Sequence, residues 1–177
     1  MSTDIFMERL WPQPQTDADM QTMMEAMGCL NIHRITWCGS LLSADGREMF
    51  CHFRGPDAES LRIVMRSMPL PPGRIWACTV QDTRPELGAA ELARANVIVG
   101  HEFDSPADYA ARELSEKVNM GCFQLHRVRR VRSYLSTDRL RMFSLYEAPD
   151  AESVRVVQRQ AELPPDRVWA VRRFSPP

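Results

Sequence analysis

Apolar and polar positions alternate along this chain in short segments that predict strands, and longer periodic stripes predict helices between them. Extended apolar segments cover residues 5–10 and 97–103, and helical periodicity follows over 17–27 and 107–120. Within the first helix a stripe of methionines has the i, i+3, i+4, i+7 spacing of one helix face: Met20, Met23, Met24 and Met27. Such a stripe can form a soft ligand-binding surface, but we interpret it as core packing.

Each predicted helix is followed by two strands around a turn. The first turn contains Asp45-Gly46, a strong signal for a two-residue hairpin loop, and the second contains the weaker Thr137-Asp138-Arg139. After each hairpin an aspartate is a candidate helix N-cap, Asp57 in the first half and Asp150 in the second. Each of these helices should end before a Leu-Pro-Pro triplet, because proline cannot continue a helix, and a last strand follows.

The two halves of the chain repeat one another. Residues 55–77 read GPDAESLRIVMRSMPLPPGRIWA and residues 148–170 read APDAESVRVVQRQAELPPDRVWA. A shift of 93 residues aligns 27–77 with 120–170 without a gap, and it places His101 on Glu8. The sequence therefore predicts an α+β protein with two tandem ferredoxin-like βαββαβ units, residues 1–80 and 97–177, joined by a linker over 81–96.

Each predicted sheet carries its helices on one face, so its other face needs a partner. Packing the two bare faces sheet-to-sheet would give a pseudo-twofold α/β barrel with a cavity shared by the two repeats. Successive residues of a strand point to opposite faces of the sheet, so a two-residue turn determines which hairpin side chains lie on each face. On one face the repeats have nearly the same chemistry, as expected where each packs its own helices. The other face differs and carries most of the ionisable groups, so we expect it to line the cavity.

The residues predicted to line this cavity suit a small-molecule site. They are Trp37, His52, Arg54, Arg130, Arg132, Tyr134 and Glu147. His52 could act as a general base or a metal ligand, and Tyr134 as an acid or hydrogen-bond donor. The arginines could bind a carboxylate or enolate. A simpler alternative is that Arg54 and Glu147 pair across the interface while the others only pack.

A metal site is a second candidate. His52 and His101 with a carboxylate would suit a borderline transition metal, although no HxH or HxxxH spacing supports such a site. His101, flanked by apolar residues in a predicted strand, could equally be a satisfied core residue.

Composition excludes several classes of function. A net charge of −1 over 177 residues favours neither nucleic acid nor an anionic membrane. The basic cluster at 126–132 is not accompanied by a strand with the aromatic pattern of RNA-recognition modules. No apolar run is long enough to span a bilayer, and the first residues lack the pattern of a secretory signal. Five cysteines without a CxxC pair predict reduced thiols in a cytoplasm.

Several segments resemble a bacterial family of small ferredoxin-like proteins, the DUF4242 or nickel-binding-protein-like family. They are Glu8-Arg9, Ser133-Tyr134-Leu135, the run from Leu145 to Glu152 and the run from Leu163 to Trp169. The resemblance implies a one-unit protein that dimerises through its sheets, so this chain looks like a fused dimer. It also implies nickel or a related divalent metal held largely by histidines, but His33, His52, His101 and His126 match no family metal motif.

Two functions follow from these observations. The first is a cytoplasmic binding protein for a nickel-like divalent metal or a small ligand in the cavity between the repeats, without nucleic-acid or membrane partners and compatible with a homo-oligomer. The alternative is a cofactor-free isomerase, lyase or monooxygenase of the α/β-barrel superfamily that acts on an anionic or carbonyl-bearing substrate, by analogy of fold alone. A third hypothesis is that the protein is a structural interaction module.

Overall fold

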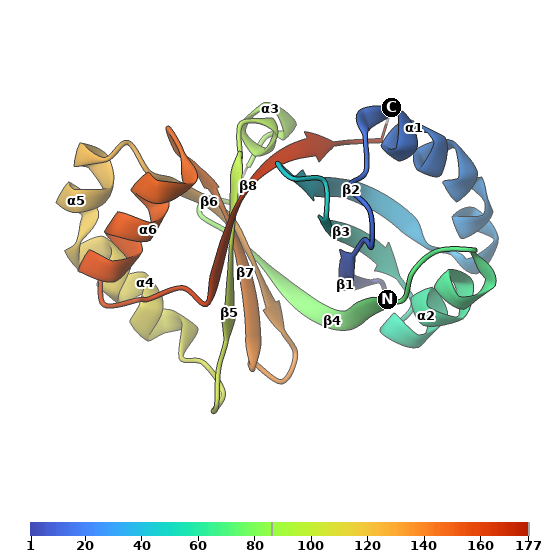
Figure 1. Cartoon of the computed structure of the whole chain (residues 1–177). Coiled ribbons are helices and arrows are strands. Elements are labelled where there is room, and N and C mark those ends of the chain that lie inside the picture. The colour runs from blue at the N-terminus through green and yellow to red at the C-terminus, as the bar shows by residue number, and fades with distance from the viewer. Residues whose placement is uncertain (86, 177) are drawn as a thin grey trace. The chain divides into compact units, whose positions relative to one another are not determined.

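The computed structural model describes residues 1–85 and 87–176 as an α+β protein (Figure 1). The first elements are β1 (Thr3–Leu10), α1 (Asp17–Ala26), the 3-10 helix η1 (Met27–His33), β2 (Thr36–Ser43), β3 (Glu48–Gly55), α2 (Ala58–Ser67) and β4 (Gly73–Asp82). The remaining elements are α3 (Ala89–Ala93), β5 (Val97–Glu102), α4 (Tyr109–Val118), α5 (Met120–Leu125), β6 (Arg129–Ser136), β7 (Arg141–Glu147), α6 (Ala151–Gln160) and β8 (Arg167–Phe174).

Both predicted N-caps are confirmed. The carboxylate of Asp57 accepts the Ser60 backbone N–H at 2.7 Å, and that of Asp150 accepts the Ser153 N–H at 2.7 Å. Each side chain satisfies an N–H group that has no partner within the helix, so both helices begin where the sequence predicts. The long helices predicted over 17–27 and 107–120 end earlier, and each is followed by a second short helix, η1 or α5.

The chain divides into two compact units. The first comprises residues Met1–Cys78 and Arg172–Pro177, and the second comprises Thr79–Val171. The end of β4 therefore belongs to the second unit and the end of β8 to the first. The strands form a closed antiparallel barrel. Hydrogen-bonded neighbours follow one another in the order β1-β3-β2-β8-β5-β7-β6-β4.

In the first unit β1 is central and pairs antiparallel with β3 and β4, and β3 pairs with β2. Helices α1 and α2 lie on the same side of this sheet (Figure 1). The predicted core role of the methionine stripe is confirmed for three of its four residues: Met20, Met23 and Met27 are buried in the cluster between helices and sheet, whereas Met24 is only partly buried and lies outside that cluster. The second unit has the same plan, with β5 between β7 and β8, β6 beside β7, and a core that includes Val154 and Val157 of α6.

The predicted assignment of hairpin side chains to the two faces of the sheet is correct near the turn but wrong at the far end of each hairpin. Leu42 lies opposite Met49, as a two-residue turn predicts, but the register shifts between Trp37 and Gly39. The second hairpin has the same shift between Arg130 and Arg132. A bulge adds one residue to one strand and reverses the facing of every side chain beyond it. Trp37 and Arg130 therefore face the helices of their own units, contrary to the sequence prediction.

Gly39 follows the bulge of the first hairpin, whereas Arg132 has the equivalent position in the second hairpin. Gly39 has φ of +140°, and a Cβ there would lie 2.9 Å from the Arg173 side chain and 3.2 Å from the Phe174 carbonyl oxygen. The end of β8 thus approaches β2 too closely for a side chain at this position.

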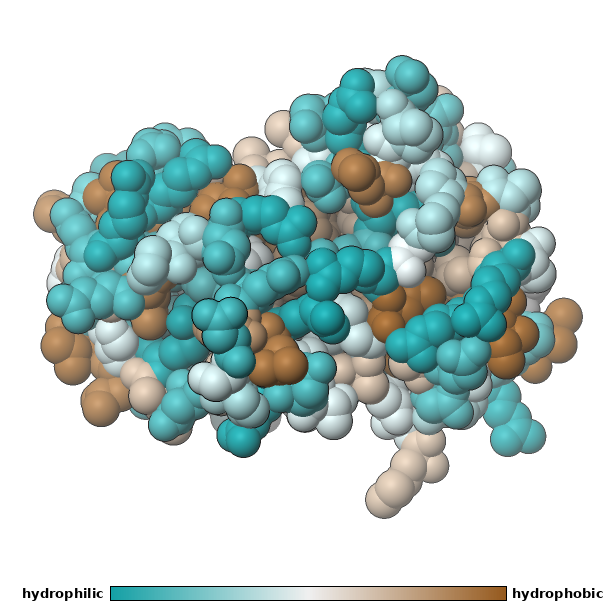
Figure 2. All heavy atoms as spheres, turned by 60° about the horizontal axis from the view of Figure 1, so that its bottom comes forward, coloured by the Kyte–Doolittle hydropathy of each residue, from teal (hydrophilic) through white to brown (hydrophobic). Residues whose placement is uncertain are grey.

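The surface has no extended apolar face in the view of Figure 2, where hydrophilic side chains predominate and apolar ones are scattered among them. Within the described part of the chain, no helix combines the length and the apolar character that crossing a membrane requires.

Candidate functional site

In the first unit, two of the predicted site residues meet at a carboxylate from the central strand. His52 Nε2 lies 2.8 Å from Asp4 Oδ1, and Arg54 Nε donates to the same oxygen at 3.1 Å. The pairing of β1 with β3 creates this cluster, since it sets Asp4 directly opposite Arg54 and next to His52. His52 is only 8% exposed, whereas 61% of the Arg54 side chain is exposed. The arrangement is a histidine oriented by a carboxylate, with an arginine at its rim.

The third predicted residue of this unit lies elsewhere. Because of the bulge, Trp37 is opposite Phe53 and packs against the helix-side core. Its indole N–H donates to Ser40 Oγ at 3.0 Å.

In the second unit, Arg132 and Glu147 pair with different charged residues. Arg132 makes a bidentate pair with Asp82, at 2.5 and 2.8 Å. Glu147 accepts a hydrogen bond from Arg129 and lies 3.3 Å from Arg94. Tyr134 is 2% exposed and lies opposite Phe143.

Arg130 joins a different cluster because the bulge turns it toward α4. Its Nε donates to Glu116 at 2.7 Å, its Nη2 to Glu113 at 3.3 Å, and its Nη1 to the hydroxyl oxygen of Tyr109. The side chain of Arg130 is 9% exposed and that of Glu116 is 17% exposed. The hydrogen bonds of Arg130 thus connect strand β6 to three side chains of one helix.

Glu116 extends the cluster into the core. Its second oxygen accepts the hydroxyl of Tyr146 at 3.0 Å, and that hydroxyl in turn accepts the side-chain amide of Gln158 at 2.8 Å. Tyr146 is 1% exposed and Gln158 is fully buried. We call Tyr109, Glu113, Glu116, Arg130, Tyr146 and Gln158 the α4 network.

The ionisation states of the α4 network follow from burial and charge. Burial alone would lower the pKa of Arg130, but Glu116 and the two tyrosine hydroxyls raise it above its ordinary value. Burial raises the pKa of Tyr146 well above its ordinary value, and the adjacent Glu116 raises it further. Burial also raises the pKa of Tyr109. At neutral pH the arginine is therefore a fixed cation and both tyrosines are protonated.

A pocket of about 310 Å³ adjoins the α4 network. Its lining includes the ionisable side chains of Glu113, Glu116, Lys117, Arg129 and Arg130 and the apolar side chains of Met120, Phe123 and Val128. Helices α4 and α5 and the start of β6 supply these residues, so the pocket lies within the second unit. Its volume is within the range of small-molecule sites, and ionisable groups with shifted pKa values beside a pocket are typical of functional sites.

The predicted metal ligands do not fit a nickel-like site. His101 lies on the helix-covered side of β5, where its Nε2 is 2.9 Å from Arg112 Nη2, while His52 is bound to Asp4. Burial and the positive charge of Arg112 lower the pKa of His101 to about 4. In residues 1–85 and 87–176, no group of three or more His, Cys, Asp or Glu side chains could hold an ion.

Sequence reasoning missed the residues that surround Arg130. Tyr109, Glu113 and Glu116 stand at i, i+4 and i+7, so they form a polar stripe on one face of a predicted helix. That stripe was the available signal, but only the bulge at residue 131 brings Arg130 to it. Asp4, the partner of His52, gave no comparable signal.

Comparisons with known proteins concern mainly the second unit and the fold. The profile of a family described as nickel responsive protein SCO4226-like matches residues 98–171. No curated protein matches the chain. A solved structure provisionally described as chlorite dismutase TA0507 is 14% identical, with a TM-score of 0.57, over 98% of this chain and 94% of the other. A provisionally described monooxygenase from Lactobacillus acidophilus is 10% identical, with a TM-score of 0.47, over 97% and 94%. The first of these structures shows a shared fold.

Proposed function

We propose that this protein binds a small organic molecule in the pocket beside the α4 network. The observation that carries the proposal is the mixed lining of this pocket, which combines the ionisable side chains of Glu113, Glu116, Lys117, Arg129 and Arg130 with the apolar side chains of Met120 and Phe123. A core that only needed to pack would not surround an open pocket with two carboxylates and an arginine, because burying charge costs free energy.

The hydrogen-bond partners of the α4 network indicate the chemistry of the ligand. Arg130 already donates to Glu116, Glu113, Tyr109 and Ser133. The carboxylates keep spare acceptor positions, and the side chain of Glu113 is 36% exposed. The proposed ligand therefore presents a hydroxyl or amine donor to the glutamates and an apolar body to Met120 and Phe123.

The proposal is tested by ligand-observed NMR with benzylamine and benzyl alcohol, and with toluene as a probe that lacks the donor. We expect saturation transfer to the first two probes, reduced by at least about fivefold in Glu113→Gln, since a hydrogen bond to a charged group contributes about 1.5–3 kcal/mol. Glu25→Gln, an exposed glutamate on α1, is the matched control and should leave binding unchanged. Equal transfer to toluene, or equal transfer in both variants, contradicts the proposal.

An enzyme is the second candidate function, and the Asp4–His52 pair favours it. A carboxylate 2.8 Å from a ring nitrogen of a nearly buried histidine orients the ring as in general bases. The roles predicted for His52 as base and for Tyr134 as acid in an isomerase, lyase or monooxygenase remain part of this proposal. Solvent deuterium incorporation into a bound ligand, abolished by His52→Gln, would support it, and the absence of exchange in the unmodified protein would contradict it.

We also propose that both halves of the chain are related to the nickel-responsive family. The family profile covers the second half, and the 93-residue self-similarity extends the resemblance to the first, so the chain is interpreted as a fused pair of DUF4242-like units. The cavity predicted between the repeats, its lining by Arg54, Arg132 and Glu147, the cytoplasmic location and a homo-oligomeric state remain predictions.

A further inference from the structure

The first unit contains a buried arginine without a carboxylate partner. Arg9 is the next-to-last residue of β1 and is 2% exposed. Its Nη2 contacts only two sulfur atoms, those of Met7 at 3.6 Å and Met65 at 3.5 Å. Its Nε and Nη1 have no hydrogen-bond partner. The guanidinium lies over the ring of Trp11, 5.6 Å from its centroid.

This arrangement is unfavourable without an additional group. A buried charge normally has an oppositely charged partner, and each buried N–H group without an acceptor costs about 1–3 kcal/mol. Thioether sulfur is a weak acceptor and cannot replace a carboxylate. Burial lowers the pKa of Arg9, which is the effect of an uncompensated environment on a cation. An acceptor that carries negative charge would satisfy these donors.

In the second unit, the strand position equivalent to Arg9 has a different side chain. Arg9 lies opposite Met49 and His101 lies opposite Met142, two methionines that correspond by the 93-residue shift. Strand register thus makes Arg9 the counterpart of His101, although the sequence alignment placed His101 on Glu8. His101 is a neutral side chain next to Arg112. At this strand position the first unit thus has a cation whose Nε and Nη1 lack acceptors, whereas in the second unit the partly exposed Arg112 bonds the neutral His101, so the environment of Arg9 is not a requirement of the shared fold.

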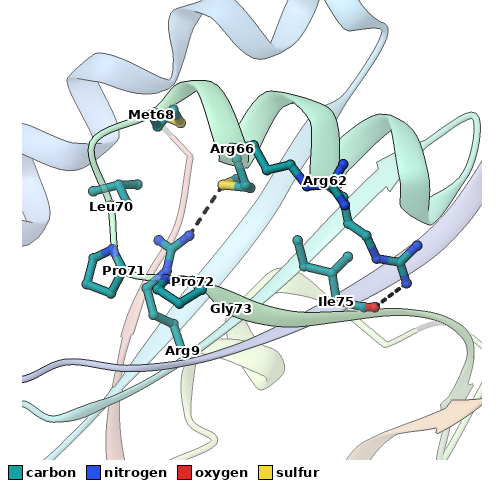
Figure 3. A pocket seen from close by; sticks show the side chains of 10 residues that line it. Arg9, Arg62, Arg66, Met68, Leu70, Pro71, Pro72, Gly73 and Ile75 are labelled. Carbon is teal, nitrogen blue, oxygen red and sulfur yellow. Dashed lines mark hydrogen bonds between the residues drawn. The ribbon is translucent and has the colours of Figure 1, made fainter.

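Arg9 lines a pocket, which Figure 3 shows from close by. Its guanidinium extends from β1 toward α2, beside Leu70, Pro71 and Pro72 (Figure 3). The apolar part of the lining also includes Met65, Met68 and Ile75, and the polar part consists of Arg9, Arg62 and Arg66. The lining contains three cations and no carboxylate.

The other two arginines have a structural role and shape the rim. Arg62 donates to Glu59 and, at 2.6 Å, to the backbone carbonyl of Ile75. Arg66 also donates to Glu59. In the second unit Arg155 and Arg159 make the same contacts with Glu152, and Arg155 also bonds the carbonyl of Val168. This pattern ties helix to strand in both units, so the unusual group in the first unit is Arg9.

We propose that the pocket between α2, the end of β1 and the start of β4 is a binding site for a small organic carboxylate with an apolar body. The planar guanidinium of Arg9 matches a carboxylate in bidentate geometry, and the methionine, leucine and proline side chains suit the hydrocarbon part. The methionines are flexible and can adapt to its shape. A volume of about 240 Å³ accommodates roughly eight water-sized groups, so the carboxylate is small, of the size of benzoate or hexanoate.

Isothermal titration with benzoate and hexanoate tests the proposal, with benzamide as the neutral analogue and inorganic phosphate as an anion without an apolar body. We expect saturable binding of the two carboxylates, and binding at least about tenfold weaker for benzamide and phosphate. Arg9→Met should weaken carboxylate binding by at least about tenfold. Arg159→Gln is the control: this arginine has the position on α6 that Arg66 has on α2, its side chain is 61% exposed, and the substitution should leave carboxylate binding unchanged.

The thermal stability of Arg9→Met shows whether weaker binding comes from loss of the site or from loss of the fold. Replacing an uncompensated buried cation by a side chain of similar length should raise the thermal midpoint of the free protein or leave it unchanged. Arg9→Lys provides a second variant, which keeps the charge but loses the bidentate geometry and should bind carboxylate more weakly than the unmodified protein.

Three results would overturn the proposal: no carboxylate binding by the unmodified protein, equal affinity for benzamide, or full binding by a folded Arg9→Met protein. Glu113→Gln changes only the pocket of the second unit, so failure of one site is distinguishable from failure of the other.

Discussion

Replacing Arg130 by methionine removes the residue that joins β6 to α4. The substitution keeps most of the side-chain volume but removes the hydrogen bond from Arg130 to Glu116, whose other oxygen still accepts from the Tyr146 hydroxyl, and leaves Glu113 without its ion pair to Arg130. Removing one member of a buried ion pair costs about 3–5 kcal/mol. Because the side chains of Glu116 and Glu113 are 17% and 36% exposed, water can partly solvate them, and we expect about 3 kcal/mol.

The measurement is equilibrium unfolding in urea, followed by circular dichroism, with thermal unfolding in parallel. A loss of about 3 kcal/mol corresponds to a midpoint about 6–12 °C lower for a chain of this length. Arg159→Met is the matched control. That arginine pairs with Glu152 on α6, but both side chains are more than half exposed, at 61% and 63%, so we expect a loss of at most about 1 kcal/mol.

A double-mutant cycle tests the assigned cause. Glu116→Gln removes the charge that Arg130 leaves behind, so the double variant should be more stable than the sum of the two single losses predicts, by about 0.5–3 kcal/mol. Two results would refute the reasoning: a loss below about 1 kcal/mol in Arg130→Met, or strict additivity in the cycle. Either would mean that the network is hydrated and contributes little to stability.

Three further predictions follow from the same contacts. Tyr146→Phe removes a buried hydroxyl that bonds Glu116 and Gln158, and urea unfolding should show a loss of about 1–3 kcal/mol; a change below about 0.5 kcal/mol would contradict it. The folded-state pKa of His101, about 4, lies below its ordinary value of 6.5, so the unfolded chain takes up the proton first and stability falls as the pH decreases from 6.5 toward 4. Between pH 7 and 5 this loss should be about 2 kcal/mol in the unmodified protein and absent in His101→Gln, with the exposed His33→Gln as control; equal slopes in all three would disprove it. Nickel titration should show no stoichiometric binding that depends on either predicted metal ligand, and one bound ion per chain, lost in His52→Ala or His101→Ala, would show that the geometry has been misinterpreted.

Local chemistry determined much of this protein before any tertiary contact is considered. The positions of the caps follow from single aspartates, because an N-cap needs only a side-chain oxygen and the following backbone. The register of each hairpin near its turn and the burial of the methionine stripe follow from periodicity, which sequence displays directly. Asp57, Asp150, Met20 and Met23 therefore lie where the sequence predicts.

The functional surfaces were decided by tertiary structure, because they depend on which elements approach one another. A bulge inserts one residue without a distinctive side-chain signature, yet it turned Trp37 and Arg130 to the helix side. In the sequence, Arg9 is only one charged residue near the end of a predicted strand. Only the packing of α2 and of the loop before β4 over this strand shows that its guanidinium is buried and that its Nε and Nη1 have no acceptor. Whether a polar group is satisfied depends on its surroundings and not on its position in the chain.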